Sequence, residues 1–182
     1  MEDIRIEIVE YDPEWPVHFE REATRMEEIL GDHVVSIEHI GSTSVPGLAA
    51  KPIVDICPVV SDMDEGRTCA ELLQEAGYSP GEQDRPDDWI SLGRNHDEGQ
   101  QFNVHIRPRY SDAVTRYLLL REYLRDHPEA REEYGEVKRK AAENHSTDTT
   151  EYTRAKSDVI QSILECARNE GYDPKIRRRE NQ

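Results

Sequence analysis

Two apolar runs joined by a loop of small residues constrain the fold of this chain more than any other feature. The first run, residues 34–40, ends in Gly41-Ser42, and the second, residues 53–60, carries one acid, Asp55. An acid inside a strand that is expected to be buried costs several kcal/mol unless a cation or hydrogen bonds compensate it. The backbone N–H groups of a Gly-Ser turn can cradle a phosphate. This segment therefore predicts a phosphate-binding turn beside a metal-binding carboxylate.

The charge balance limits the possible partners. The 182 residues fit one domain with a real core, and the formal net charge is −16. A chain with this negative charge would repel the phosphate backbone of a nucleic acid. The charge therefore argues against nucleic acid as a partner, although the C-terminal tail is basic. Only 5 of the 23 basic residues are lysines. Acid excess with scarce lysine suggests a halophilic protein that stays soluble at high salt; the alternative is an ordinary acidic protein.

The cysteines and the hydropathy predict a cytoplasmic location. The three cysteines, Cys57, Cys69 and Cys166, are widely spaced and form no CxxC pair. We therefore expect all three to be reduced thiols and two of the three to lie in the core. No apolar run approaches the roughly 20 residues of a membrane span. The N-terminal residues lack the basic and apolar regions of a signal peptide.

Hydrophobic periodicity predicts an α+β fold. Strands are expected over residues 4–8, 34–40, 53–60, 89–92 and 102–106, the last two joined as a hairpin. Helices are expected at 13–31, from Asp62 or Asp64 to Gly77, and at 112–127, 129–143 and 148–169. Helices thus dominate after residue 107. We expect a single domain over residues 1–172 and a disordered basic tail over 173–182.

Strand periodicity groups the candidate site residues. Alternate residues of a strand share a face, which pairs Asp55 with Cys57 and aligns three residues of the later strand: Asn103, His105 and Arg107. If these strands are neighbours, Asp55 and His105 converge beside Ser42. As a metal ligand, Asp55 suits Mg²⁺, whereas His105 suits Zn²⁺, Mn²⁺ or Fe²⁺ better. The alternative for His105 is a hydrogen-bonded histidine that binds no metal.

Lysines add a second feature. Lys51 precedes the acidic strand and either contacts a phosphate or pairs with an acid. Two later helices repeat an aromatic residue and a lysine four positions apart: Tyr134 with Lys138, and Tyr152 with Lys156. That spacing places both members on one side of a helix, although charges on these helices are otherwise typical of solvated faces.

The order of these motifs resembles the GrpB family over about residues 4–170. The resemblance begins with YDPEWPVHF at residues 11–19 and is most specific in IEHIGSTSVPGL at 37–48 and AKPIVDI at 50–56. It continues through His105 and ends in helical motifs that include Leu124-Arg125, His127-Pro128 and the two aromatic–lysine pairs. It implies a nucleotidyltransferase-like fold, with a mixed β-sheet, flanking helices and a helical C-terminal part.

A first hypothesis, based on the Gly-Ser turn followed by a strand acid, is a nucleotide-binding enzyme of the nucleotidyltransferase type. A nucleotide or another small phosphorylated ligand would be held by Gly41, Ser42, Ser44, Lys51 and Arg107. Asp55 would be catalytic and, with His105, would bind a divalent metal such as Mg²⁺ or Mn²⁺. The far side of the cleft, expected to bind substrate, would be lined by Lys138, Tyr152 and Lys156. The reaction would be nucleotidyl or phosphoryl transfer to an unknown acceptor.

One departure keeps other functions open. Active enzymes of this fold carry a D-x-D-like pair, whereas this chain reads Asp55-Ile56-Cys57 and lacks the second acid. A second hypothesis is therefore a regulatory module that binds a nucleotide or small molecule and has lost transfer activity. A third is a metal-dependent hydrolase that uses Asp55 with His39 or His105. A related domain occurs fused to some bacterial dephospho-CoA kinases, which associates the family with nucleotide or coenzyme A metabolism.

Overall fold

A five-stranded mixed sheet forms the centre of the protein. The computed structural model describes residues 5–81, 87–96 and 99–176. The strands are β1 (Ser36–Ile40), β2 (Ile53–Val60), β3 (Ser79–Pro80), β4 (Ile90–Asn95) and β5 (Gln101–Pro108). Their order is β1-β2-β5-β4-β3, and only β2 and β5 pair in parallel; the other neighbours are antiparallel. The two strands expected to carry the site are therefore direct neighbours.

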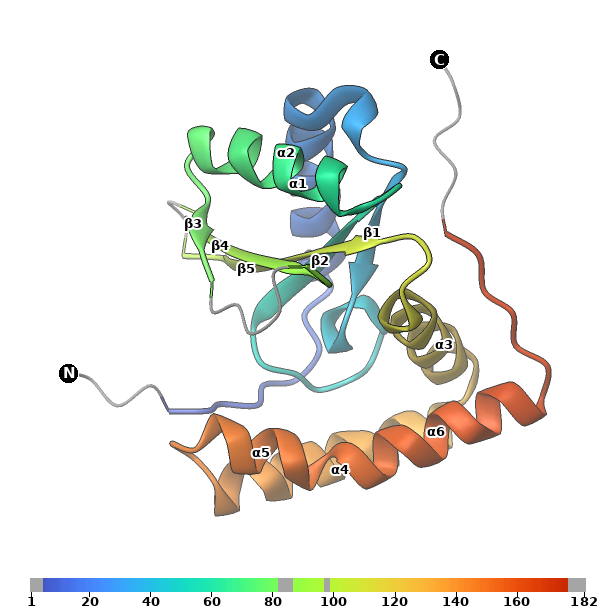
Figure 1. Cartoon of the computed structure of the whole chain (residues 1–182). Helices are drawn as coiled ribbons and strands as arrows, with labels where there is room; N and C mark the ends of the chain where they lie inside the picture. The colour runs from blue at the N-terminus through green and yellow to red at the C-terminus, as the bar shows by residue number, and fades with distance from the viewer. Residues whose placement is uncertain (1–4, 82–86, 97–98, 177–182) are drawn as a thin grey trace.

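Two helices cover one face of the sheet (Figure 1). These are α1 (Glu14–Leu30) and α2 (Met63–Glu75), and a short 3₁₀ turn, η1 (Gly31–His33), follows α1. The Asp12 carboxylate accepts a hydrogen bond from the Glu14 amide at 2.9 Å, and Asp62 does the same for the first turn of α2. Residues three or four apart on α1 are buried against the sheet: Trp15, Phe19, Ala23, Met26 and Leu30. Their spacing is what the sequence predicts for one apolar helical stripe.

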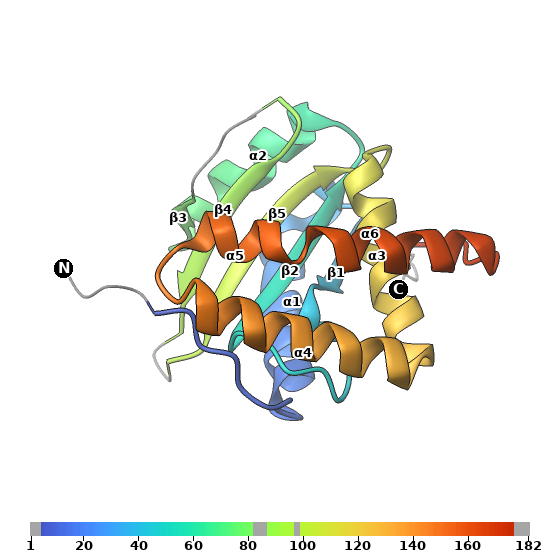
Figure 2. The same ribbon diagram turned by 90° about the horizontal axis from the view of Figure 1, so that it is seen from below.

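Four helices lie on the other side of the sheet (Figures 1 and 2). They are α3 (Asp112–Asp126), α4 (Pro128–Asn144), α5 (Thr149–Ala155) and α6 (Ser157–Asn169). Helix α3 packs on β1 and β2 through a cluster that includes Ile40, Val59 and Leu118. Another cluster joins α3, α4 and α6 to the loop after β1. The predicted α+β class with a helical C-terminal part is confirmed.

The predicted strand at residues 4–8 is wrong. Ile4 lies outside the described residues, and residues 5–8 belong to no strand; Val9 alone forms an isolated bridge with Ala50. Ile6 packs instead against Ala141 and Tyr152 of the C-terminal helices, and its amide donates to the Ser146 carbonyl at 2.7 Å. These residues form an extended segment that lies across helices. Its side chains alternate between buried and exposed with the same period as those of a strand in a sheet.

The predicted helix at 148–169 is also wrong in one respect, because it is two helices that meet at Lys156. The Ser157 hydroxyl donates to the Thr153 carbonyl at 3.3 Å. Such a side-chain bond to the carbonyl one turn earlier bends helices. The break places Lys156 between α5 and α6, where its side chain turns into the cleft described below.

The C-terminal tail is described only in part. Residues 173–176 have no helix or strand, and Ile176 packs against the cluster that holds α3 on the sheet. The rest of the predicted tail, residues 177–182, lies outside the described residues. Across the described ranges, none of the helices combines the length and hydropathy of a membrane span.

Candidate functional site

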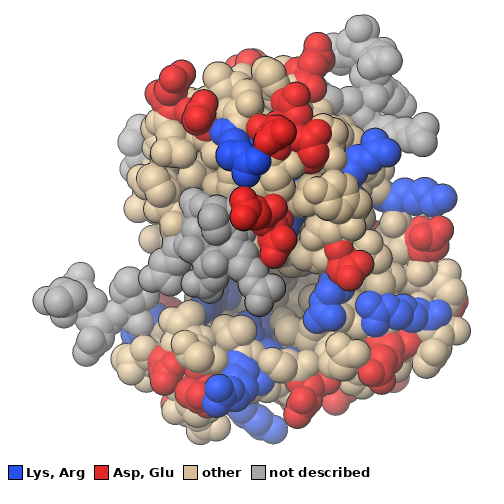
Figure 3. All heavy atoms as spheres, viewed as in Figure 1, with Lys and Arg blue, Asp and Glu red and all other residues tan. Residues whose placement is uncertain are grey.

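A cleft of about 770 Å³ separates the sheet from the C-terminal helices. Its lining comes from the end of β1, the following turn η2 (Ser42–Ser44), the start of β2, strand β5 and helices α3, α4 and α5. The space-filling view shows a recess with basic side chains at this level, between the sheet layer and the lower helices (Figure 3). The volume lies within the usual range of small-molecule sites.

The turn after β1 lies directly against Asp55. Gly41 has φ +71° and ψ −174°, a region that side chains rarely adopt. A Cβ atom at this position would lie 2.6 Å from Asp55 Oδ2. Glycine at 41 therefore permits both the backbone turn and the close approach of the carboxylate.

Replacing Gly41 by alanine is expected to disturb both features. We expect a loss of about 2 kcal/mol in the free energy of unfolding, from the strained backbone and the contact with Asp55. Gly171→Ala is the matched control, because Gly171 has φ +79° and a Cβ added there would meet no atom within 4 Å. It should cost only the backbone term, about 1 kcal/mol. Urea denaturation of both variants measures the difference, and equal losses would contradict a role for the Asp55 contact.

Asp55 and His105 meet in the cleft. In the ladder between β2 and β5, Asp55 lies opposite Asn103, and His105 follows on the same face. His105 Nε2 lies 3.3 Å from Asp55 Oδ1. The two side chains, Asp55 and His105, are 28% and 22% exposed, so both remain open to solvent and to a ligand.

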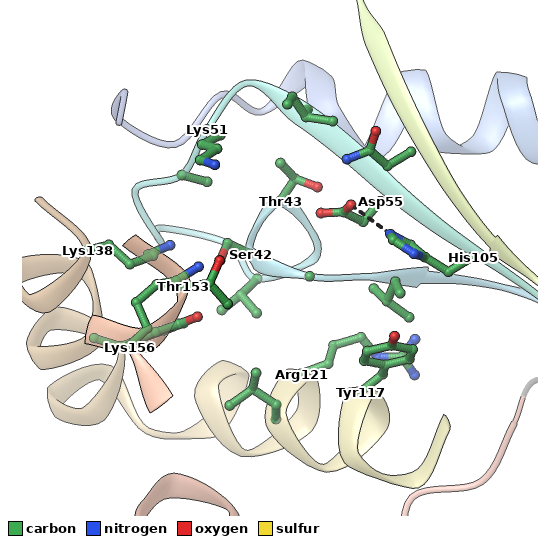
Figure 4. A pocket seen from close by; sticks show the side chains of 18 of the residues that line it. Ser42, Thr43, Lys51, Asp55, His105, Tyr117, Arg121, Lys138, Thr153 and Lys156 are labelled. Carbon is green, nitrogen blue, oxygen red and sulfur yellow. Dashed lines mark hydrogen bonds and ion pairs between the residues drawn. The ribbon is translucent and has the colours of Figure 1, made fainter. Parts of the chain in front are cut away.

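Three lysines form a cluster on the opposite wall, defined here as Lys51, Lys138 and Lys156 (Figure 4). Lys51 Nζ and Lys156 Nζ lie 4.4 Å and 4.1 Å from the centroid of the Tyr152 ring. Lys138 is 2% exposed, lies over the Tyr134 ring and donates to the Ala49 carbonyl. Among the described residues, none of the ion pairs includes any of these three lysines.

Burial lowers the pKa of each lysine in this cluster. The pKa of Lys138 falls to about 7 and that of Lys156 to about 8, in both cases mainly by desolvation and further by neighbouring cations. The pKa of Lys51 is lowered by the same main cause, with Asp55 opposing the shift. Asp55 opposes the pKa shift of Lys138 and Lys156 as well. Within the part of the chain that the structure describes, these three lysines lie together without an ion pair to an acid, so an anionic ligand would favour their charged forms.

Two residues predicted to hold phosphate lie outside the cleft lining. Ser44 is buried, its hydroxyl donates to the Gly41 carbonyl at 2.5 Å, and its own carbonyl accepts from Arg125. Arg107 lies behind the lining, against the rings of Trp89 and Tyr117. The other predicted site residues line the cleft: Gly41, Ser42, Lys51, Asp55, His105, Lys138, Tyr152 and Lys156.

Comparison with known proteins identifies the family. A family model described as GrpB protein matches residues 5–166. The chain belongs to the GrpB family. Among its relatives is a UPF0157 protein of Streptomyces coelicolor, 40% identical over 167 residues that cover 89% of this chain and 84% of that protein. A UPF0157 protein of Halalkalibacterium halodurans is 38% identical over 162 residues, covering 89% and 82% of the two chains.

A longer relative contains the GrpB region as a part. A dephospho-CoA kinase of Mycobacterium tuberculosis is 30% identical over 188 residues, which cover 88% of this chain but 46% of that protein. This GrpB chain therefore spans about half the length of that relative, in agreement with the expected fusion.

Solved structures show the fold. The crystal structure of the conserved protein GrpB from Enterococcus faecalis has a TM-score of 0.78 at 31% identity and covers 90% of this chain and 98% of that chain. The Cid1 poly(U) polymerase with MgGTP bound has a TM-score of 0.56 at 16% identity and covers 81% and 50% of the two chains. The fold of this GrpB chain is therefore nucleotidyltransferase-like, as predicted.

The residue at the position of the missing second acid, Cys57, does not fit the role of a metal ligand. Cys57 lies opposite Glu38 on the β1–β2 ladder and is buried, and burial raises the pKa of its thiol, which keeps it neutral. Glu38 is 1% exposed and binds Arg121 Nη1 at 3.0 Å, so its charge is already matched. Across the described parts of this GrpB chain, no group of three or more His, Cys, Asp or Glu residues could hold a metal ion.

The remaining donors fit a single ion that is bound partly by the protein and partly by a substrate. Mg²⁺ is commonly bound by one or two carboxylates together with waters and substrate phosphates. Asp55 supplies one carboxylate at the cleft surface, and His105 lies beside it. The donor set thus fits a single divalent ion brought in with a phosphorylated ligand, and does not fit a two-metal centre.

Several cleft residues were not predicted as site residues. They are Thr43, Trp89, Tyr117, Arg121, Tyr134, Thr149 and Thr153. Tyr134 could have been predicted from the sequence, because it precedes Lys138 by one helical turn. Tyr117 and Arg121 lie within the predicted helix from residue 112, where the sequence pattern indicated packing only.

Proposed function

We propose that the cleft binds the phosphate chain of a nucleotide together with one divalent ion, and that the protein is a transferase of the nucleotidyltransferase type. The observation that carries this proposal is the cluster of Lys51, Lys138 and Lys156 facing the Gly-Ser turn. Three of the five lysines of the chain gather on this wall. Burial disfavours the charged form of these lysines, and a ligand with several phosphate charges would stabilise that form.

Each side chain has a defined task in this proposal. The lysines would neutralise the terminal phosphates and orient them, while Ser42 would donate to a phosphate oxygen from the turn. Asp55 would lie next to the reacting phosphorus and would share a divalent ion with the phosphate oxygens. When bound, that ion supplies charge neutralisation and polarises the oxygen under attack. His105, whose Nε2 lies 3.3 Å from Asp55 Oδ1, would orient this carboxylate or accept a proton from an acceptor hydroxyl.

Calorimetry tests the binding step. We expect tripolyphosphate and nucleoside triphosphates to bind, with affinity falling as pH rises from 7 to 9, because the pKa values of Lys138 and Lys156, about 7 and 8, leave these groups increasingly neutral there. Binding near pH 8 should take up protons, since the bound phosphates favour the charged lysines. Titrations in buffers of different ionisation enthalpy measure this uptake. Absence of heat with every triphosphate, with and without Mn²⁺, would refute the proposal.

A second candidate function is supported by Cys57. Because a buried neutral thiol replaces the second acid, the protein would bind the nucleotide without transferring it and would act as a regulatory module. Release of pyrophosphate or phosphate from a bound triphosphate in the presence of Mg²⁺ separates the two candidates. Turnover that Asp55→Asn abolishes would support the transferase, whereas binding without turnover over a range of acceptors would support the module.

A further inference from the structure

Three aromatic rings line the end of the cleft beyond Asp55. They are Trp89, just before β4, His105 on β5, and Tyr117 on α3. The ring centroids of Trp89 and His105 are 5.9 Å apart with planes tilted by 32°, and those of His105 and Tyr117 are 6.4 Å apart. These rings come from three separate segments of the chain and form one wall, which we call the aromatic wall.

Arg107 packs against two of the three rings of the aromatic wall. Its guanidinium carbon lies 4.6 Å from the Trp89 ring centroid and 5.9 Å from that of Tyr117, and Nη2 donates to the Tyr117 hydroxyl at 3.2 Å. Within the described ranges, no ion pair includes Arg107, and its Nε atom is buried without a hydrogen-bond partner. The cation is thus compensated by ring faces. This arrangement fixes the rings before any ligand arrives, which lowers the entropic cost of stacking on them.

The order of groups along the cleft matches the order of groups in a nucleoside triphosphate. In Figure 4 the three lysines lie on one side of Asp55, His105 lies on the other, and Tyr117 lies below these two residues. With terminal phosphates at the lysines and the reacting phosphorus near Asp55, the nucleoside would extend toward the aromatic wall.

We propose that the aromatic wall is a stacking subsite for the planar base of the same nucleotide whose phosphates bind the lysine cluster. This inference rests on the proposed function and adds to it the place where the base of the nucleotide binds. Base stacking on aromatic side chains tolerates different bases, because every base has a π face. Modest discrimination among the four common bases is therefore expected.

Tryptophan fluorescence gives a direct test. The chain has two tryptophans, and Trp15, a residue of α1, is 1% exposed. Trp89 is therefore the tryptophan that a cleft ligand can reach. We expect nucleoside triphosphates, and free nucleosides at higher concentration, to quench this fluorescence, whereas tripolyphosphate should bind by calorimetry without quenching. A Trp15→Phe variant, if it folds, assigns the signal to Trp89; otherwise the comparison of ligands on the unmodified protein carries the same information.

Substitution of Trp89 separates stacking from phosphate binding. Trp89→Ala should weaken nucleoside triphosphate binding by roughly 5- to 100-fold and leave tripolyphosphate binding unchanged, while Trp89→Phe should retain most of the affinity. Tyr110→Ala is the matched control, because Tyr110 is 71% exposed and is not part of the cleft lining.

Other outcomes would overturn the inference. These are equal losses for both ligands, no loss for the triphosphate, or a nucleoside that binds alongside the triphosphate without competition. The last result would assign the aromatic wall to a separate acceptor. If no triphosphate gives heat, the proposed function fails, but quenching of Trp89 by nucleosides would still support a base-stacking site at the aromatic wall.

Discussion

Lys138→Met is expected to make the protein more stable and, at the same time, much weaker in binding phosphate. A pKa lowered from 10.5 to about 7 corresponds to about 4 kcal/mol of destabilisation at neutral pH. Loss of the hydrogen bond to the Ala49 carbonyl offsets about 1 kcal/mol of that gain. We expect the free energy of unfolding to rise by about 3 kcal/mol, or roughly 6–12 °C in Tm, and tripolyphosphate affinity to fall by at least about tenfold.

The pH dependence identifies the cause of the stabilisation. Between pH 7 and 10.5 the unfolded chain binds more protons at Lys138 than the folded chain does, so the wild-type protein gains stability as pH rises through this window. The variant lacks that gain, and the two stability curves should converge at alkaline pH. Lys140→Met, an exposed lysine on the same helix, is the matched control and should change neither quantity. Thermal unfolding from pH 6 to pH 10 measures both, and a less stable Lys138→Met protein would contradict the prediction.

Arg121→Met is expected to produce the largest loss of stability. Arg121 Nη1 binds the Glu38 carboxylate at 3.0 Å and the His39 carbonyl at 3.0 Å, and Glu38 is 1% exposed. Removing the guanidinium leaves a buried carboxylate without its cation, which costs about 3–5 kcal/mol. For a chain of this length, Tm should fall by roughly 6–20 °C. Denaturant unfolding measures the loss.

A double variant separates the buried charge from simple packing. Arg121→Met combined with Glu38→Met removes both charges, and we expect stability to return to within about 1 kcal/mol of the wild type. Arg116→Met, an exposed position on the same helix, should have little effect. If the double variant is as unstable as Arg121→Met alone, the loss comes from packing at position 121 and the ion pair is not its source.

The local elements of this protein could be read from the sequence because their signals are local. Strand β2 has the predicted bounds, Ile53–Val60, because its eight residues form an apolar run that is interrupted only by Asp55. Helix α1 follows Asp12-Pro13 and ends before Gly31, since capping and chain reversal depend on neighbours only. The exceptions are residues 5–8 and Lys156, where contacts with other helices or a side-chain bond to the backbone decided the conformation.

Only the part of the candidate site whose residues lie close together in the sequence could be predicted. Gly41, Ser42 and Asp55 lie within one loop and two neighbouring strands, so the turn and its carboxylate follow from the chain order. The aromatic–lysine spacing on the last helices also indicated which lysines share a side with an aromatic ring. The inclusion of Trp89 and the exclusion of Arg107 from the cleft depend on how α3 packs on the sheet, which no local pattern encodes.

By itself, the sequence determined the family, the mixed α+β architecture, and the pairing of a Gly-Ser turn with a strand acid. Each of these follows from residue type and short-range spacing, which fix backbone conformation and the buried face of each element. Only the tertiary structure decided that Lys51, Lys138 and Lys156 converge, that Cys57 is sealed in the interior, and that three rings form a wall beyond Asp55. Convergence of distant residues depends on helix packing and on the desolvation it imposes, and these are properties of the folded molecule as a whole.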